Sequence, residues 1–119
     1  MSFMLTTDQV RARSKTVTRR IGWKNAKVGD VVQPVVKGQG LKRGEHVEKL
    51  GGPIRFTSVT REMLSLIQLQ RRRGKSEMTK EGFPGMEPGE FIVMFAHHNK
   101  LKTIDTPVTR IEFEYVEAQ

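Results

Sequence analysis

Apolar and polar residues alternate with two different periods along the chain, and each period predicts a type of element. Residues 109–115 place Thr, Ile, Phe and Tyr at every second position against Arg and Glu, which is typical of a half-buried strand. Residues 16–18 are a Thr-Val-Thr run, and such β-branched side chains also favour a strand. Three more segments have strand-like composition: 31–36, 54–59 and, where the pattern resumes, 63–67.

Two helices are predicted from signals at their N-termini. Thr6 and Gln9 have the spacing of a capping box, so a short helix is expected to begin at Thr6 and to end near Arg13. Pro88 fits the first position of a second helix, in which apolar side chains recur on one face as far as about Asn99.

The predicted elements add up to a small α+β domain. Roughly four to six short strands and two or three short helices are expected, and long helices do not regularly separate the strands. A doubly wound parallel sheet is therefore disfavoured, and a mixed or closed β-sheet with flanking helices is favoured. Residues 69–80 carry no clear pattern, and the Gly- and Lys-rich residues 37–45 are interpreted as a mobile loop. No long linker divides the chain, so residues 1–119 are interpreted as one domain.

The amino-acid composition limits the cell compartment and the kinds of site that we expect for this protein. The chain has 119 residues, of which 36% are hydrophobic and 29% charged, and it contains no cysteine. A disulfide framework and a thiolate metal site are both excluded. No apolar run approaches the length of a membrane span, and the N-terminus lacks a signal-peptide pattern, so we expect a cytoplasmic protein without a membrane partner.

The formal net charge of +8 is unevenly distributed along the chain. Residues 11–27 contain seven basic side chains and no acid, and such a field attracts phosphate polyanions. This basic block predicts a nucleic acid or nucleotide partner, with a solubilising surface as the alternative. A second basic cluster at 71–75 has no interleaved aromatic side chains and is interpreted as a solvated patch.

The stretch SKTVTRRIGW, residues 14–23, contains the residue types of a hydrolytic site. The Thr18 hydroxyl becomes a nucleophile only when a base takes its proton, and Lys15 can do so only if neighbouring cations or burial lower its pKa. Arg20 can hold a phosphate or stabilise an oxyanion. A regular strand would point residues 15 and 18 to opposite faces, so they converge only if Lys15 lies before the strand or at a bulge. The alternative is a basic strand with Val17 buried and its Lys and Arg solvated.

Two other features have less specific interpretations. Trp23, the only tryptophan, could stack on a base or cap the core. His97 and His98 are adjacent rather than one helical turn apart, and no Asp, Glu or Cys stands nearby at ligand spacing. We therefore expect a helix end there rather than a metal site, and no cofactor is expected.

SKTVTRR, together with Gly29-Asp30 and with Glu81-Gly82-Phe83-Pro84 ahead of the second helix, resembles the ASCH domain family of the PUA-like superfamily. The similarity covers nearly the whole chain and is strongest to the small single-domain ASCH proteins of bacteria and their phages. The family motif is G-x-K-x-x-T-x-R. Lys15, Thr18 and Arg20 match it, whereas Arg13 stands at the position of the glycine and places a bulky cation beside the lysine.

The resemblance implies a PUA-like mixed β-barrel with two or three short flanking helices and a basic cleft for RNA or a modified nucleoside or nucleotide. Small ASCH proteins include amidohydrolases that remove the acetyl group from N(4)-acetylcytidine. Their functional lysine, threonine and glutamate correspond to Lys15, Thr18 and Glu81. In such an enzyme Thr18 attacks the acetyl carbonyl, Lys15 takes its proton, and Glu81 orients Lys15 or protonates the leaving amine.

Other ASCH proteins are proposed ribonucleases or RNA-binding regulators, so membership of the fold does not decide the activity. Binding of RNA or a modified nucleoside is our first hypothesis, and amide hydrolysis is the alternative. A phage or bacterial interaction module without catalysis is the third. The residues expected to contact the ligand are Arg13, Arg19, Arg20 and Trp23.

Overall fold

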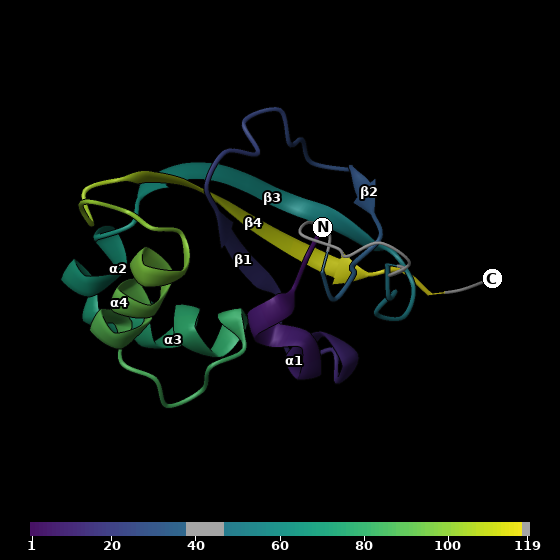
Figure 1. The fold of residues 1–119 in the computed structure, drawn as a ribbon, viewed down its shortest axis with the longest axis horizontal. Coiled ribbons are helices and arrows are strands. Elements are labelled where there is room, and N and C mark those ends of the chain that lie inside the picture. Colours follow the sequence, from purple (N-terminus) through teal and green to yellow (C-terminus); the bar gives the residue numbers. More distant parts are fainter. Residues whose placement is uncertain (38–46, 118–119) are drawn as a thin grey trace.

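The chain folds into a curled antiparallel sheet with short helices gathered beside it (Figure 1). The computed structural model describes residues 1–37 and 47–117, so most of the loop predicted at 37–45 lies outside the described residues. Within this part of the chain the α+β class is confirmed. The elements in chain order are the 3-10 turn η1 (Met4–Thr6), α1 (Thr7–Arg11), β1 (Val17–Arg20), β2 (Val31–Val32), β3 (Ile54–Met63), α2 (Leu66–Leu69), α3 (Arg71–Glu81), α4 (Pro88–His98) and β4 (Pro107–Tyr115).

The sheet has the strand order β1-β4-β3-β2, and each ladder between these strands is antiparallel. The long strands β3 and β4 lie at its centre, and β1 and β2 form its edges (Figure 1). A bulge between Phe56 and Ser58 shifts the register of β3 against β4, and such bulges increase the local twist. A parallel contact, the isolated bridge between Ser2 and Val35, ties the N-terminal segment to the chain that follows β2.

Two predicted strands differ from the observed ones. Segment 63–67 does not continue β3, because the chain turns into α2, which buries Ile67 in an apolar cluster with α3 and α4. Segment 31–36 pairs with β3 only through Val31–Val32. Pro34 stands two residues after the end of β2 and has no N–H to donate to a sheet ladder.

The first helix is shorter than predicted, and its capping box is not formed. Thr6 is the N-cap of α1 but makes no side-chain cap hydrogen bond, because it is buried and already belongs to η1. The Thr7 hydroxyl instead donates to the Phe3 carbonyl at 2.9 Å. The second predicted helix is confirmed, since α4 begins at Pro88 and has Asn99 as its C-cap.

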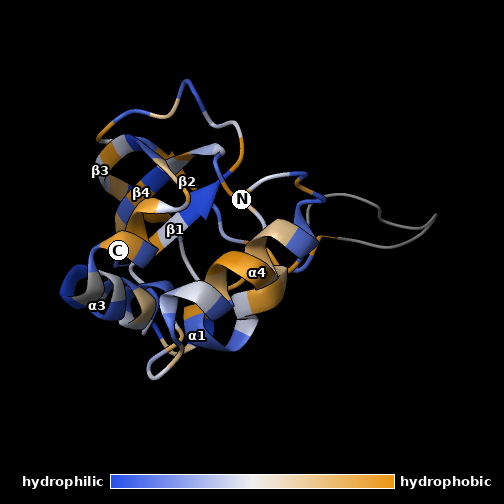
Figure 2. Cartoon of the chain, turned by 90° about the vertical axis from the view of Figure 1, so that its left-hand side faces the viewer, coloured by the Kyte–Doolittle hydropathy of each residue, from blue (hydrophilic) through white to orange (hydrophobic). Residues whose placement is uncertain are grey.

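Helix α3 occupies most of residues 69–80, for which the sequence predicted no structure. Its buried positions are Gly74, Glu77, Met78 and Glu81, which is the i, i+3, i+4, i+7 spacing of a helical stripe. Only one of these side chains is apolar, so hydropathy does not reveal the stripe. Figure 2 shows the contrast, with α3 largely hydrophilic and α4 largely hydrophobic.

Two apolar clusters form the core. The first packs the N-terminal segment against β3 and β4, and its buried members are Phe3, Val10, Leu50, Ile54, Phe56, Ile111 and Phe113. The second joins the three later helices to the start of β4, and its buried members are Leu64, Ile67, Met78, Phe91, Ile92, Phe95 and Val108. In residues 1–37 and 47–117 no helix combines the length and the apolar composition that crossing a membrane requires.

Replacing Gly74 by alanine is expected to destabilise the fold, because α3 packs closely on α2 at this glycine. A Cβ at this position would stand 2.3 Å from the Ile67 carbonyl oxygen and 2.8 Å from Cγ of Pro88. Overpacking of this kind costs about 1–3 kcal/mol, which urea unfolding measures. Gly89→Ala is the matched control, because its Cβ meets no neighbour within 4 Å. An equal loss in both variants would contradict the packing explanation.

Candidate active site

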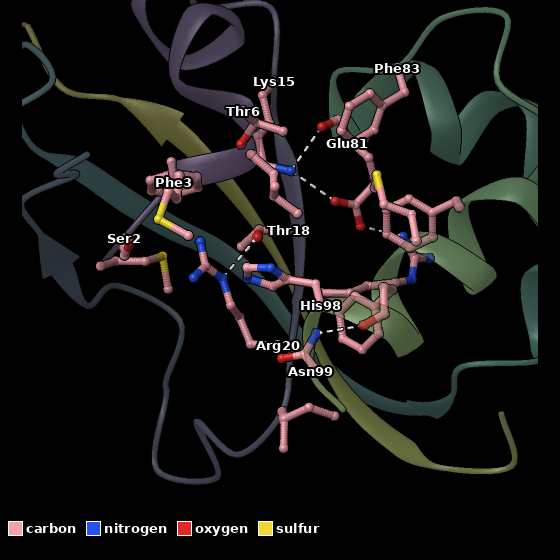
Figure 3. A pocket seen from close by; sticks show the side chains of 18 of the residues that line it. Ser2, Phe3, Thr6, Lys15, Thr18, Arg20, Glu81, Phe83, His98 and Asn99 are labelled. Atoms are coloured by element: carbon pink, nitrogen blue, oxygen red, sulfur yellow. Dashed lines mark hydrogen bonds and ion pairs between the residues drawn. The ribbon is translucent and has the colours of Figure 1, made fainter. Parts of the chain in front are cut away.

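A cavity of about 530 Å³ lies where the N-terminal segment, β1 and α4 meet. Its volume is within the range of small-molecule sites. The cavity is lined by six of the seven predicted site residues, namely Lys15, Thr18, Arg19, Arg20, Trp23 and Glu81. Figure 3 shows the ammonium of Lys15, the hydroxyl of Thr18 and the guanidinium of Arg20 turned toward a common space.

Lys15 lies in the turn between α1 and β1, and two hydrogen bonds fix the backbone there. The Tyr115 hydroxyl donates to the Lys15 carbonyl at 2.6 Å, which anchors the turn to β4. The Thr16 amide donates to the Lys80 carbonyl at 2.8 Å, which anchors it to α3. Lys15 therefore precedes the strand, which is one of the two arrangements that would let residues 15 and 18 share one site.

Glu81, the last residue of α3, is the direct partner of Lys15. Its side chain is only 2% exposed, and Lys15 Nζ donates both to Glu81 Oε1 and to the Glu81 carbonyl, each at 2.8 Å. Gly82 ends the helix in the left-handed region, with φ at 100°. A Cβ on Gly82 would stand 2.9 Å from Cγ of Gln9, so glycine allows α1 to pack against the end of α3 that carries Glu81.

Thr18 and Arg20 are two residues apart on β1 and therefore point to the same face of the sheet. Arg20 Nε donates to Thr18 Oγ1 at 3.0 Å. The guanidinium also lies over the Phe3 ring, with Cζ 4.7 Å from the ring centroid, a cation–π contact that fixes its position. Because the Thr18 oxygen accepts a hydrogen bond from Arg20, the hydroxyl proton remains available for another acceptor.

The environment of Lys15 makes the loss of its proton easier than in water. Burial lowers the pKa of Lys15 below its ordinary value; Glu81 opposes this effect, whereas Arg20 and Arg19 add to it. A neutral amine has two N–H donors and one lone pair. In that form the two N–H groups of Lys15 can donate to Glu81 Oε1 and to the Glu81 carbonyl. The lone pair is then free to accept a proton from a group in the cavity. Burial also lowers the pKa of Arg20, to about 10, so Arg20 is still a cation at neutral pH.

Arg19 belongs to a layer of buried and half-buried charges between the sheet and α3. Its guanidinium is 0% exposed and contacts Glu81 Oε2 at 2.8 Å and Glu77 Oε1 at 2.5 Å. Arg19 was predicted to contact the ligand. In the structure its guanidinium forms ion pairs with two carboxylates of α3 instead. We call this set the ion-pair layer and define it as Lys15, Arg19, Glu62, Arg73, Glu77, Glu81, Arg110 and Glu112.

The other two predicted ligand contacts have different positions. Arg13 does not line the cavity, because it pairs with Glu117 at 2.7 Å and its Cζ stands 5.6 Å from the ring centroid of Tyr115. Trp23 lines the cavity and is 39% exposed, while its ring packs edge-on against Phe56 at a centroid distance of 6.4 Å. Trp23 therefore covers part of the core and still presents a surface to a ligand.

The sequence did not identify the aromatic wall of the cavity or the end of α4 as parts of a site. The residues concerned are Phe3, Phe83, Phe91, Phe95, His98 and Asn99. The apolar stripe of α4 was predicted, but an apolar stripe is ordinarily core. The sequence feature that could have indicated a site is the polar pair His98 and Asn99, which follows the apolar stripe at the C-terminal end of α4. Both residues line the cavity together with the aromatic residues (Figure 3).

Fewer side chains of the basic block at residues 11–27 are available to bind an anion than the sequence indicates. Four of its seven basic side chains pair with acids that come from distant parts of the chain, namely Arg11 with Glu48, Arg13 with Glu117, Lys15 with Glu81, and Arg19 with Glu62, Glu77 and Glu81. The second basic cluster is also partly paired, since Arg73 contacts Glu62 at 2.8 Å. The positive field available to a polyanion is therefore smaller than the formal charge indicates.

Within the described ranges, no group of three or more His, Cys, Asp or Glu side chains is placed to hold a metal ion. Comparison of this chain with known protein families, with curated proteins and with solved structures finds no match. The geometry of the cavity is therefore the main basis for assigning a function.

Proposed function

We propose that the chain is an ASCH-type domain of PUA-like fold whose cavity binds a modified nucleoside and hydrolyses an amide on it, with N(4)-acetylcytidine as the first candidate substrate. One observation carries the proposal: Lys15, held by Glu81, and Thr18, held by Arg20, share one cavity. The resemblance of SKTVTRR to the ASCH motif supports the nucleoside as the class of ligand.

The reaction proceeds in two halves. Thr18 Oγ1 forms a bond to the acetyl carbon while its proton passes to the Lys15 amine. The C–N bond then breaks, and Lys15 returns the proton to the leaving amine, which gives cytidine and an acetyl ester on Thr18. Water attacks this ester with Lys15 again as the base, which releases acetate and restores the Thr18 hydroxyl.

Glu81 orients Lys15 in this scheme and does not donate a proton. One carboxylate oxygen of Glu81 accepts a hydrogen bond from Lys15 and the other from Arg19, each at 2.8 Å, so both oxygens are already engaged by basic side chains. Of the two roles considered for Glu81 from the sequence, the contacts favour orientation of the base.

Binding of RNA without hydrolysis is the second candidate, and the cations left without an acid favour it. In the part of the chain that the structure describes, Arg20, Lys24 and Lys27 make no ion pair, and Lys37 lines the cavity. An RNA bound through these side chains would lose affinity as salt rises. Titration of single-stranded RNA at two salt concentrations measures this dependence.

The proposed hydrolysis is tested with N(4)-acetylcytidine by following the release of cytidine chromatographically. The wild type is expected to turn the substrate over, and Lys15→Ala and Thr18→Val are expected to lose at least about 10³-fold in kcat, because each removes a member of a unit that acts together. Thr18→Ser is the matched control, since it keeps a hydroxyl. Absence of turnover in the wild type at high protein concentration would remove the hydrolase proposal and leave RNA binding.

A further inference from the structure

Arg20 is a half-buried cation that contacts no carboxylate in the part of the chain that the structure describes. Lys15, Arg19 and Arg110 each contact at least one glutamate at 2.8 Å or less. In residues 1–37 and 47–117, by contrast, Arg20 makes no ion pair, and its one hydrogen bond to protein joins Nε to Thr18 Oγ1. A half-buried cation without a contacting anion is still costly, so its presence beside a reactive hydroxyl needs an explanation.

No carboxylate among the described lining residues contacts Arg20, although the negative charge of Glu81 partly offsets its burial. Glu81 is the one carboxylate among the described lining residues, and Lys15 and Arg19 already hold both of its oxygens. The two terminal nitrogens of Arg20 make no hydrogen bond to the described protein atoms. Their orientation is fixed nevertheless, because the Phe3 ring supports the guanidinium and Nε is tied to Thr18 (Figure 3).

We propose that Arg20 is a catalytic residue that stabilises the oxyanion of the tetrahedral intermediate formed when Thr18 attacks the amide. This inference rests on the proposed function and assigns to Arg20 a role that the proton transfers alone do not require. The matching anion is missing from the resting protein because it exists only during the reaction. An electrostatic stabiliser acts best when it is fixed beforehand and left unpaired until charge develops.

The charge balance of the step agrees with this role. When the Thr18 oxygen bonds to the carbonyl carbon, the C=O electron pair moves to the carbonyl oxygen and creates a negative charge, while the Thr18 proton moves to Lys15. The guanidinium donates its terminal N–H groups to that oxyanion. Collapse of the intermediate returns the electron pair to the C=O bond and breaks the C–N bond, which leaves Arg20 unpaired again.

An oxyanion-stabilising arginine and a substrate-binding arginine have different kinetic signatures. Arg20→Met keeps an apolar stem for the Phe3 ring but removes the charge, and we expect it to lower kcat by about 10²-fold or more while KM changes less than about threefold. Arg20→Lys keeps the charge and is expected to lose less. Arg55→Met removes an exposed arginine of β3 that pairs with Glu114, and should leave both constants near wild type. A rise in KM with unchanged kcat would overturn the inference.

A binding measurement tests Arg20 separately from turnover. Methylphosphonate carries a tetrahedral anionic centre, whereas acetamide is planar and neutral. Wild type is expected to bind methylphosphonate about tenfold or more tightly than acetamide, and Arg20→Met, checked for folding by thermal unfolding, is expected to lose the preference. If wild type shows this preference without hydrolysing N(4)-acetylcytidine, the proposed substrate is wrong and the oxyanion site stands. If wild type shows no preference, the role of Arg20 is refuted.

Discussion

Glu77→Gln is expected to lower the free energy of unfolding by about 3–5 kcal/mol, because it removes one partner from a buried ion-pair network. The Glu77 side chain is 2% exposed. Its Oε1 accepts from Arg19 and from Arg110, each at 2.5 Å, and its Oε2 accepts from Arg110 at 3.0 Å. Glutamine keeps the size of the side chain but removes a negative charge that both guanidinium groups contact, so Arg19 is left with Glu62 and Glu81, and Arg110 with Glu112.

The same variant should change the acid sensitivity of the protein. Burial opposes ionisation of Glu77, but hydrogen bonds from Arg110 and Arg19 outweigh it and hold the pKa of Glu77 at about 2, below its ordinary 4.5. Because the folded-state pKa is depressed, this carboxylate stabilises the fold above pH 4.5, and its contribution is lost as the pH falls from 4.5 toward about 2. Glu77→Gln should lack this part of the pH dependence.

Urea unfolding at a series of pH values measures both effects of Glu77→Gln. Glu114→Gln is the matched control, because its partner Arg55 is exposed on the sheet and exposed pairs contribute about 1 kcal/mol or less. A loss at neutral pH that is no greater in Glu77→Gln than in Glu114→Gln would show that the ion-pair layer does not hold α3 to the sheet.

The pH dependence of hydrolysis should follow the protonation of Lys15. A base must be neutral, so kcat/KM is expected to rise with pH through the pKa of Lys15, which burial lowers from its ordinary value of 10.5. Glu81 works in the opposite direction, because its negative charge raises this pKa. Glu81→Gln should therefore lower the pKa of Lys15 further and move the rise in activity to lower pH.

The shift is measured from the pH profile of kcat/KM and, where turnover is too slow, from an NMR titration of the Lys15 side chain. Glu62→Gln is the matched control, because it removes a charge from the ion-pair layer without touching Lys15; Glu62 contacts Arg19 and Arg73 instead. Movement of the profile to higher pH in Glu81→Gln, or equal movement in both variants, would contradict the electrostatic role assigned to Glu81.

The elements that the sequence predicted well are those in which hydropathy decides the structure. β4 and α4 have clean periods of 2 and 3.6, and both were found close to their predicted bounds. Helix α3 was missed because its inward stripe contains Glu77 and Glu81, and a pattern of apolar residues cannot reveal a stripe of acids. Segment 63–67 was misassigned because a short apolar run fits a strand and a buried helical turn equally well.

The candidate site was predictable as a set of residue types but not as a set of contacts. The spacing of Lys15 and Thr18 left two ways for them to converge, a lysine before the strand or a bulge, and the structure has the lysine before the strand. The ion-pair partners of the basic residues could not be predicted from the sequence. Arg19, for example, contacts glutamates at positions 62, 77 and 81, which come close to it only in the folded chain. For the same reason the sequence could not distinguish Arg19, whose guanidinium contacts three glutamates, from Arg20, which makes no ion pair within residues 1–37 and 47–117.

Strand β1 carries two kinds of environment on its two sides, and this constrains how it can align with β4. Val17 pairs with Glu112 and Arg20 with Thr109, which leaves Thr18 and Arg20 on the cavity side and Arg19 on the side of α3. Displacement by a single residue would exchange these sides. The shifted register would separate the guanidinium of Arg19 from its glutamates and place a hydroxyl beside the carboxylates. Misaligned pairing of β1 with β4 is therefore disfavoured by electrostatics as well as by the loss of backbone hydrogen bonds.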